Sequence, residues 1–159
     1  MPAVRFDAVS KTYRGARGAL QALQEVSFDI EPGDFFGLLG PNGAGKTTTV
    51  SMIAGLVRPT AGVVRIDGEP PRGDTDPRRR RLGLVPQDLA LYEELTAAAN
   101  LQFFGGLYGL GGASLRAGMD AALELVGLRD RATDVVGTFS GGMKRRLNLA
   151  ASLLHDPDI

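Results

Sequence analysis

Short apolar runs alternate with turn-forming residues through the first half of the chain, and the turns include the stretches EPGD and DGEPP. Short runs bounded by Gly and Pro favour β-strands over helices. The pattern therefore predicts strands over residues 4–9, 26–30, 35–39, 63–66 and 82–85.

Apolar residues recur at helical spacing mainly in the second half. Leu115, Met119, Ala122, Leu123 and Val126, for example, share one face of a helix predicted over residues 115–126. The same spacing predicts helices over residues 46–56, 97–107 and 142–154, and the stretch GGLYGLGGA at 105–113 predicts a flexible join. Strands followed by helices indicate an α/β fold with a helical insert.

Composition narrows the class of protein. The chain has 159 residues, 43% of them hydrophobic, which suits one soluble globular domain with a real core. Acidic and basic residues balance at 18 each, so no nucleic-acid partner is expected from the overall charge. The absence of cysteine fits a reducing compartment, and no signal peptide or membrane-spanning run is visible.

A glycine-rich stretch, GPNGAGKTT, joins a predicted strand to a predicted helix. Gly40, Gly45, Lys46 and Thr47 match the pattern G-x-x-x-x-G-K-[ST], in which glycines allow backbone N–H groups to converge on phosphate oxygens. The start of the helix would add its free N–H groups to this site. Lys46 would supply a point charge, and the Thr47 hydroxyl would supply a ligand to magnesium. The alternative, a plain glycine-rich turn, does not explain why lysine and threonine follow.

A second glycine motif, FSGGMKRR at residues 139–146, precedes a predicted helix and begins with a capping serine. Together with the phosphate-loop pattern, LVPQD at 84–88 and the aromatic in SKTYRG, it resembles the ATP-binding cassette of ABC transporters over essentially the whole chain. The resemblance implies a P-loop core with an N-terminal antiparallel β subdomain over residues 1–87. A helical subdomain over 88–139 and a signature helix over 140–159 would follow.

The resemblance also implies which residues bind ligands. ATP and Mg²⁺ would be bound by Tyr13, Gly40, Pro41, Asn42, Gly43, Ala44, Gly45, Lys46, Thr47, Thr48 and Gln87, with Thr47 and Gln87 contacting the metal. Tyr13 would stack on adenine, and Gln87 would contact magnesium or the attacking water and signal to a membrane subunit. Ser140, Gly141, Gly142 and Met143 would contact ATP held by a second cassette in a dimer.

The signature departs from the family's usual Leu-Ser-Gly-Gly-Gln, because Phe139 and Met143 replace its first and last residues. Methionine cannot donate a hydrogen bond, so a contact made by the usual glutamine would be lost. The variant resembles the ABC-2 branch, whose cassettes pair with separately encoded membrane subunits that export drugs and ions. A transmembrane permease and the cytoplasmic face of the membrane are the partner and location that this implies.

Purely structural roles are open to several of these residues. Gln87 could simply end a strand, Tyr13 could belong to the core, and Arg78 to Arg81 are expected to form a solvated helical turn. His155, the single histidine, sits at a helix end where neither a metal-binding nor a catalytic role is expected.

The hydrolytic part of the family pattern is not found in the sequence. No apolar strand ending in Asp with a following Glu occurs, nor a downstream switch His, so we expect a cassette truncated after HDPDI that is inactive alone. No catalytic residue is therefore assigned beyond Gln87. A soluble ABC-type ATPase and a non-hydrolysing nucleotide-binding regulator remain alternatives to a transporter subunit.

Overall fold

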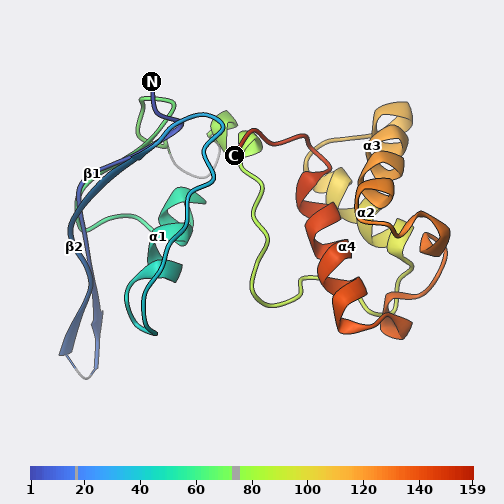
Figure 1. Cartoon of the computed structure of the whole chain (residues 1–159), viewed down its shortest axis with the longest axis horizontal. Coiled ribbons are helices and arrows are strands. Elements are labelled where there is room, and N and C mark those ends of the chain that lie inside the picture. Colours follow the sequence, from blue (N-terminus) through green and yellow to red (C-terminus); the bar gives the residue numbers. More distant parts are fainter. Residues whose placement is uncertain (17, 73–75) are drawn as a thin grey trace. The chain divides into compact units, whose positions relative to one another are not determined.

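A computed structural model of the chain describes residues 1–16, 18–72 and 76–159. The contacts within it separate into two units, Met1–Arg79 and Arg80–Ile159. The first unit contains the strands, and the second contains three longer helices (Figure 1).

The described strands of the first unit form one antiparallel sheet in the order β2-β1-β3. Its members are β1 (Val4–Gly15), β2 (Gly18–Ile30) and β3 (Ala61–Ile66). The predicted antiparallel β subdomain is thus confirmed, although β1 and β2 are longer than the apolar runs indicated. Val4 and Phe6 are buried because one side of β1 faces the core, and the register shift between Phe6 and Val9 lets Val9 face the core as well.

Irregular pairing between β1 and β2 is stabilised by two serines. Ala8 and Glu25 both adopt left-handed backbone angles, with φ of 46° and 47°, where the register shifts. The Ala8 N–H donates to Ser27 Oγ and the Glu25 N–H donates to Ser10 Oγ, each at 2.9 Å. Each hydroxyl therefore satisfies an amide on the opposite strand that regular pairing would have satisfied.

Helix α1 (Lys46–Ile53) begins where the sequence predicts but ends three residues earlier. Gly55 has a φ of 70°, its N–H donates to the Met52 carbonyl, and the Leu56 N–H donates to the Ser51 carbonyl. This pair of bonds is the Schellman arrangement, in which a left-handed glycine terminates a helix. Apolar spacing continues beyond Gly55, which explains why periodicity overestimated the helix length.

The strands predicted over residues 35–39 and 82–85 are wrong, since neither segment forms a regular strand. A buried strand needs partners on its edges, and no described residues form a ladder with residues 35–39. Phe35 and Leu39 are accordingly exposed, while Phe36 stacks on Phe28 of the sheet. Residues 82–85 resemble a strand more closely than residues 35–39 do. The Ile159 carbonyl accepts from the Gly83 N–H and the Ile159 N–H donates to the Arg81 carbonyl, which is the bonding pattern of a parallel strand pair.

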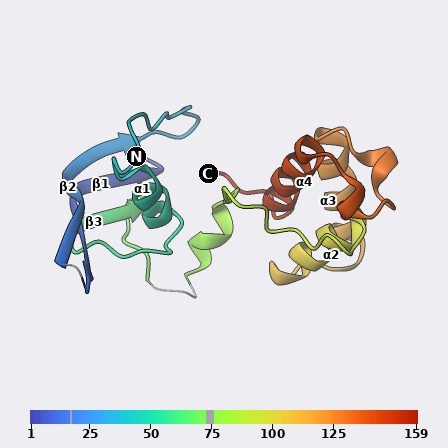
Figure 2. The ribbon, with the colours of Figure 1, turned by 90° about the horizontal axis from the view of Figure 1, so that it is seen from below.

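The second unit is helical and packs around one core. It contains α2 (Ala97–Leu107), α3 (Gly112–Leu125) and α4 (Gly141–Leu153), seen together in Figure 2, with short 3₁₀ turns η2 (Arg129–Arg131) and η3 (Val136–Thr138). The three longer helices match the predicted ones to within three residues at each end. Their core includes Leu101, Leu123, Val136, Phe139, Leu147 and Ala150.

The single histidine packs at the edge of this unit. The His155 and Tyr108 rings are stacked with centroids 3.7 Å apart, and His155 Nε2 lies 3.1 Å from the Leu82 carbonyl oxygen. Burial raises the pKa of the Tyr108 hydroxyl.

None of the described helices is both long enough and apolar enough to cross a bilayer.

Candidate functional site

The glycine-rich loop before α1 requires glycine at two positions for different reasons. Gly43 and Gly45 have φ of 85° and 83°, a region that strains other residues. A Cβ on Gly43 would meet open space, whereas one on Gly45 would lie 2.6 Å from the Ala22 carbonyl oxygen and 2.5 Å from Leu23 Cδ2. The start of α1 at Gly45 is therefore packed closely against β2, whereas Gly43 is not in close contact with other residues.

Lys46 turns its ammonium back onto the loop. Nζ donates to the Gly40 carbonyl at 2.8 Å and to the Pro41 carbonyl at 2.7 Å. The positive charge therefore lies against the two carbonyls at the start of the loop, and the first N–H groups of α1 have no acceptor within the helix. An ammonium held only by neutral carbonyls gains a stronger, charge-assisted partner when an anion enters.

The three threonines of the loop differ in their surroundings. Thr49 is buried, and its hydroxyl donates to the Gly45 carbonyl at 3.1 Å, so it supports the helix start. Thr47 is exposed to solvent. Thr48 Oγ1 lies 3.4 Å from the Tyr13 hydroxyl, which links the loop to β1. Pro41, Asn42 and Ala44 are exposed on the loop.

Tyr13 lies on β1 and does not belong to the core. Its side chain is 39% exposed, and Lys11 Nζ lies 5.0 Å from the centre of its ring. The lysine is held there because the same Nζ donates to the Arg58 carbonyl at 2.7 Å. One face of Tyr13 thus has a cation partner, which leaves the other face as the one on which a base could stack.

The second glycine motif forms the start of α4. Ser140 is the N-cap, and its hydroxyl accepts the Met143 N–H at 3.3 Å. Gly141 and Gly142 are exposed, and a Cβ on either would meet open space. The Met143 side chain packs against the hydrophobic core of the unit, so this departure from glutamine contributes to packing. Phe139 is buried in the same core.

Gln87 lies in an exposed bend that is tied to α4. The carbonyl of the preceding residue, Pro86, accepts from Arg145 Nη1 at 3.2 Å and from Asn148 Nδ2 at 3.4 Å. The segment that presents Gln87 and the helix that begins at Ser140 are therefore joined by side-chain bonds. The predicted site residues fall into two sets, with the loop and Tyr13 in the first unit and Gln87 and Ser140–Met143 in the second.

Two buried polar residues, one in each unit, were missed by the sequence reasoning. Asn100 in α2 is fully buried and bonds to both backbone groups of Tyr92 and to the Thr96 carbonyl. The Asp76 side chain is only 1% exposed and pairs with Arg78 at 2.7 Å. A polar residue among apolar helix positions was the available signal for Asn100.

The arginine run was expected to be a solvated turn. It does form the short 3₁₀ helix η1 (Pro77–Arg81), but Arg78 is largely buried rather than solvated. The Arg78 guanidinium, then the backbone N–H groups of Arg72 and Arg78, hold the pKa of Asp76 well below its ordinary value of 3.8. Arg78 is therefore engaged in an ion pair with Asp76 instead of being solvated.

A glycine-rich phosphate loop, an antiparallel sheet in the same unit and a helical unit in which α4 is capped by Ser140 and begins with two glycines define a P-loop ATP-binding cassette. Residues 23–159 match the family described as ABC transporter, and the chain belongs to that family.

Relatives with known names are also ATP-binding proteins. The chain is 44% identical over 150 residues to the linearmycin resistance ATP-binding protein LnrL of Bacillus subtilis (strain 168), covering 94% of this chain and 48% of that protein. It is 44% identical over 157 residues to the Nod factor export ATP-binding protein I of Paraburkholderia xenovorans (strain LB400), covering 99% and 50%. The chain thus spans about half the length of the curated relatives it matches.

Solved structures share the fold. The dimeric structure of MJ0796, a bacterial ABC transporter cassette, superposes with a TM-score of 0.83 at 30% identity, over 97% of this chain and 70% of that one. An ATP-binding subunit of an ABC transporter superposes with a TM-score of 0.80 at 30% identity, over 98% and 63%. The MJ0796 cassette has also been solved bound to ADP and Pi.

Proposed function

We propose that the chain is the nucleotide-binding part of an ABC transporter's ATP-binding subunit, and that Gly40 to Thr48 hold the phosphates of ATP. The observation that carries the proposal is the Lys46 ammonium held inside the loop by two neutral carbonyls. A triphosphate offers that charge a better partner, and backbone N–H groups of the loop and of α1 supply the remaining donors.

Lys46, Thr47 and Tyr13 of the first unit then have different roles in binding the nucleotide. Lys46 pairs with the outer phosphates, and the hydroxyl of the exposed Thr47 is suited to a magnesium ion carried by them. When bound, that ion neutralises phosphate charge. Among the described residues no group of three or more His, Cys, Asp or Glu could hold a metal alone, which favours a site completed by phosphate oxygens. The free face of Tyr13 stacks on adenine.

The second unit serves a nucleotide on another cassette. Ser140 fixes the start of α4, and the two exposed glycines leave its N–H groups accessible to anionic oxygen. A dimeric neighbour of similar sequence supports this assignment. Gln87 contacts magnesium or the attacking water from its bend, and Met143 contributes through packing rather than through a polar contact.

A membrane subunit is the proposed partner of the cassette, at the cytoplasmic face of a membrane. The names of two relatives, one for linearmycin resistance and one for Nod factor export, support an export role. Tyr92 follows the Gln87 segment closely in sequence and contacts Phe103 edge to face. Both rings remain partly exposed, which provides an apolar surface for such a partner. Hydrolysis is proposed for the whole transporter subunit, not for the described residues alone.

Titration calorimetry with ATP, ADP and AMP in the presence of magnesium tests the proposal. If the loop binds the outer phosphates, the affinity falls in the order ATP, ADP, AMP, with AMP at least about tenfold weaker because it cannot reach Lys46. Equal affinities for ATP and AMP would show that the base alone is bound, and the phosphate-loop assignment would then be abandoned.

A further inference from the structure

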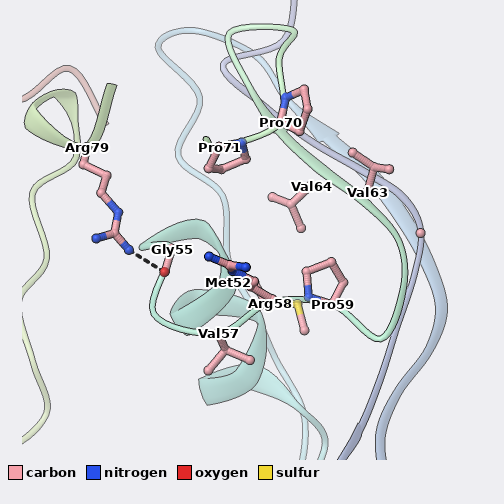
Figure 3. Close-up of a pocket in the computed structure, with 11 residues that line it drawn as sticks. Met52, Gly55, Val57, Arg58, Pro59, Val63, Val64, Pro70, Pro71 and Arg79 are labelled. Carbon is pink, nitrogen blue, oxygen red and sulfur yellow. Dashed lines mark hydrogen bonds between the residues drawn. The ribbon is translucent and has the colours of Figure 1, made fainter. Parts of the chain in front are cut away.

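A cavity of about 310 Å³ lies in the first unit between the end of α1 and β3 (Figure 3). Its apolar walls are formed mainly by Met52, Val57, Pro59, Val64, Pro70 and Pro71. Val63 and Val64 of β3 both line this space, and Val64 is the buried one of the two. Three of the wall residues are prolines, whose fixed backbone favours a preformed cavity.

The cavity is separate from the phosphate loop. Its lining begins at Met52, near the C-terminal end of α1, whereas the loop leads into the N-terminal end at Lys46. With a rise of about 1.5 Å per residue, the two ends of this helix are roughly 10 Å apart. A ligand in the cavity therefore uses different residues from those that hold the phosphates.

The charged residues that line the cavity, among those that the structure describes, are arginines. The described lining residues include two arginines, Arg58 and Arg79, and no acidic residue. The Arg79 guanidinium donates to the Gly55 carbonyl, as Figure 3 shows, and so has a fixed position. The Arg58 guanidinium makes no hydrogen bond or ion pair with any residue that the structure describes.

Glycine at position 55 makes room for the Arg79 guanidinium. Its φ is 70°, and a Cβ there would lie 2.8 Å from Nη2 and 2.9 Å from Nε of Arg79. Because the glycine lacks that atom, a guanidinium can approach the end of α1 closely beside the cavity. Apolar walls with convergent cationic groups are the features by which proteins select amphipathic anions.

We propose that this cavity binds a small organic carboxylate with an apolar aryl or alkyl body. The body fills the space between Met52, Val64 and the prolines, and the carboxylate accepts two parallel hydrogen bonds from Arg58. Arg79 also lines the cavity, where its guanidinium donates to the Gly55 carbonyl. The volume is at the small end of ligand cavities, so a compact monocarboxylate fits better than a nucleotide.

The test compares phenylbutyrate with phenylbutanol, which has the same body without the charge, by amide chemical shifts of the full chain. We expect phenylbutyrate to shift the Val57 and Val64 amides and to bind at least about tenfold more tightly than the alcohol. Arg58→Gln should remove most of that difference. Arg14→Gln removes an equal charge from the exposed β1 end of the hairpin and should leave affinity unchanged.

Two further variants distinguish this cavity from the phosphate loop and from an effect of net charge. Val57→Trp fills the cavity without changing charge and should abolish binding, while Lys46→Ala should leave it intact. Loss in Lys46→Ala would place the carboxylate in the phosphate loop and overturn the proposal. Equal losses in Arg58→Gln and Arg14→Gln would also overturn it, because they would mean that only net charge matters.

Discussion

The Lys46 ammonium and the Gly40 carbonyl oxygen lie 2.8 Å apart, so the lysine of the loop motif is bonded to its first glycine. Gly40 has a positive φ of 150°, which other residues rarely adopt, and a Cβ there would press on the Ala44 side chain at 3.1 Å. The lysine thus closes the loop around the place that the phosphates are proposed to take. Nucleotide binding would exchange an internal bond for a charge-assisted one.

Replacing Lys46 by alanine should weaken ATP binding about tenfold or more, because a charge-assisted phosphate bond is worth about 1.5–3 kcal/mol. Calorimetry measures the change directly. Lys144→Ala provides a matched control, since its ammonium pairs with Glu93 in the other unit. Equal ATP affinity in the wild type and Lys46→Ala would contradict the assignment of the loop.

Two glycines of the same loop should respond differently to alanine. Gly43→Ala meets only backbone strain, worth about 1–2 kcal/mol, because open space surrounds it. Gly45→Ala adds a collision with the rigid Ala22 carbonyl and should cost clearly more. Urea denaturation of the two variants gives both changes in unfolding free energy; similar values would show that β2 yields easily at this point.

Asp76 should make stability depend on acid. Its pKa lies below the ordinary value of 3.8 in the folded protein, so the unfolded chain takes up a proton first as the pH falls. Its contribution is full above about pH 4 and is lost progressively below it. Asp76→Asn should therefore destabilise the protein more at pH 7 than at pH 3, and a difference that is equal at both values would contradict the ion-pair account.

Asn100→Ala should lower the unfolding free energy by about 1–3 kcal/mol, because it removes the acceptor of the part-buried Tyr92 N–H, whereas the Tyr92 carbonyl still accepts from the Leu95 N–H. Gln102→Ala, an exposed neighbour on the same helix, should change stability by less than about 0.5 kcal/mol. Thermal unfolding of the two variants is the measurement. If both changes are small, water replaces the Asn100 amide.

Ser140 allows capping to be separated from phosphate contact. Ser140→Ala loses the N-cap and should cost about 0.5–2 kcal/mol, whereas Ser140→Asp keeps it. The aspartate nevertheless repels a phosphate at the same helix start, so ATP-dependent self-association, measured by light scattering, should be lost in that stable variant. Normal association of Ser140→Asp would mean that the serine acts only as a cap.

Helices could be predicted from the sequence more closely than strands. The bounds of α2 match the predicted range, because its hydrogen bonds are local and its cap, Thr96, is adjacent in sequence. The predicted strand at 35–39 was wrong because a strand depends on neighbours that its own residues do not reveal. The resemblance singled out Tyr13, yet its partner Lys11 followed only from the structure.

The parts of the candidate site that consist of consecutive residues could be predicted from sequence motifs. Gly40 to Thr48 and Ser140 to Gly142 are such stretches, and the structure gives both the helix-start geometry that the motifs require. The burial of Asp76 and the bonds to Pro86 depend on chain segments that fold together, and no local pattern specifies them.

The Pro86 carbonyl receives donors from Arg145 and Asn148, which are three residues apart on α4. Two donors from one helix fasten the bend before Gln87 to that helix at a single oxygen atom. If Gln87 is drawn toward a metal, the helix that carries Ser140 must either follow or lose both bonds. With the roles proposed for Gln87 and Ser140, a nucleotide bound at one site would move the helix that contacts the nucleotide at the other site, and the two sites of a cassette pair would be mechanically linked.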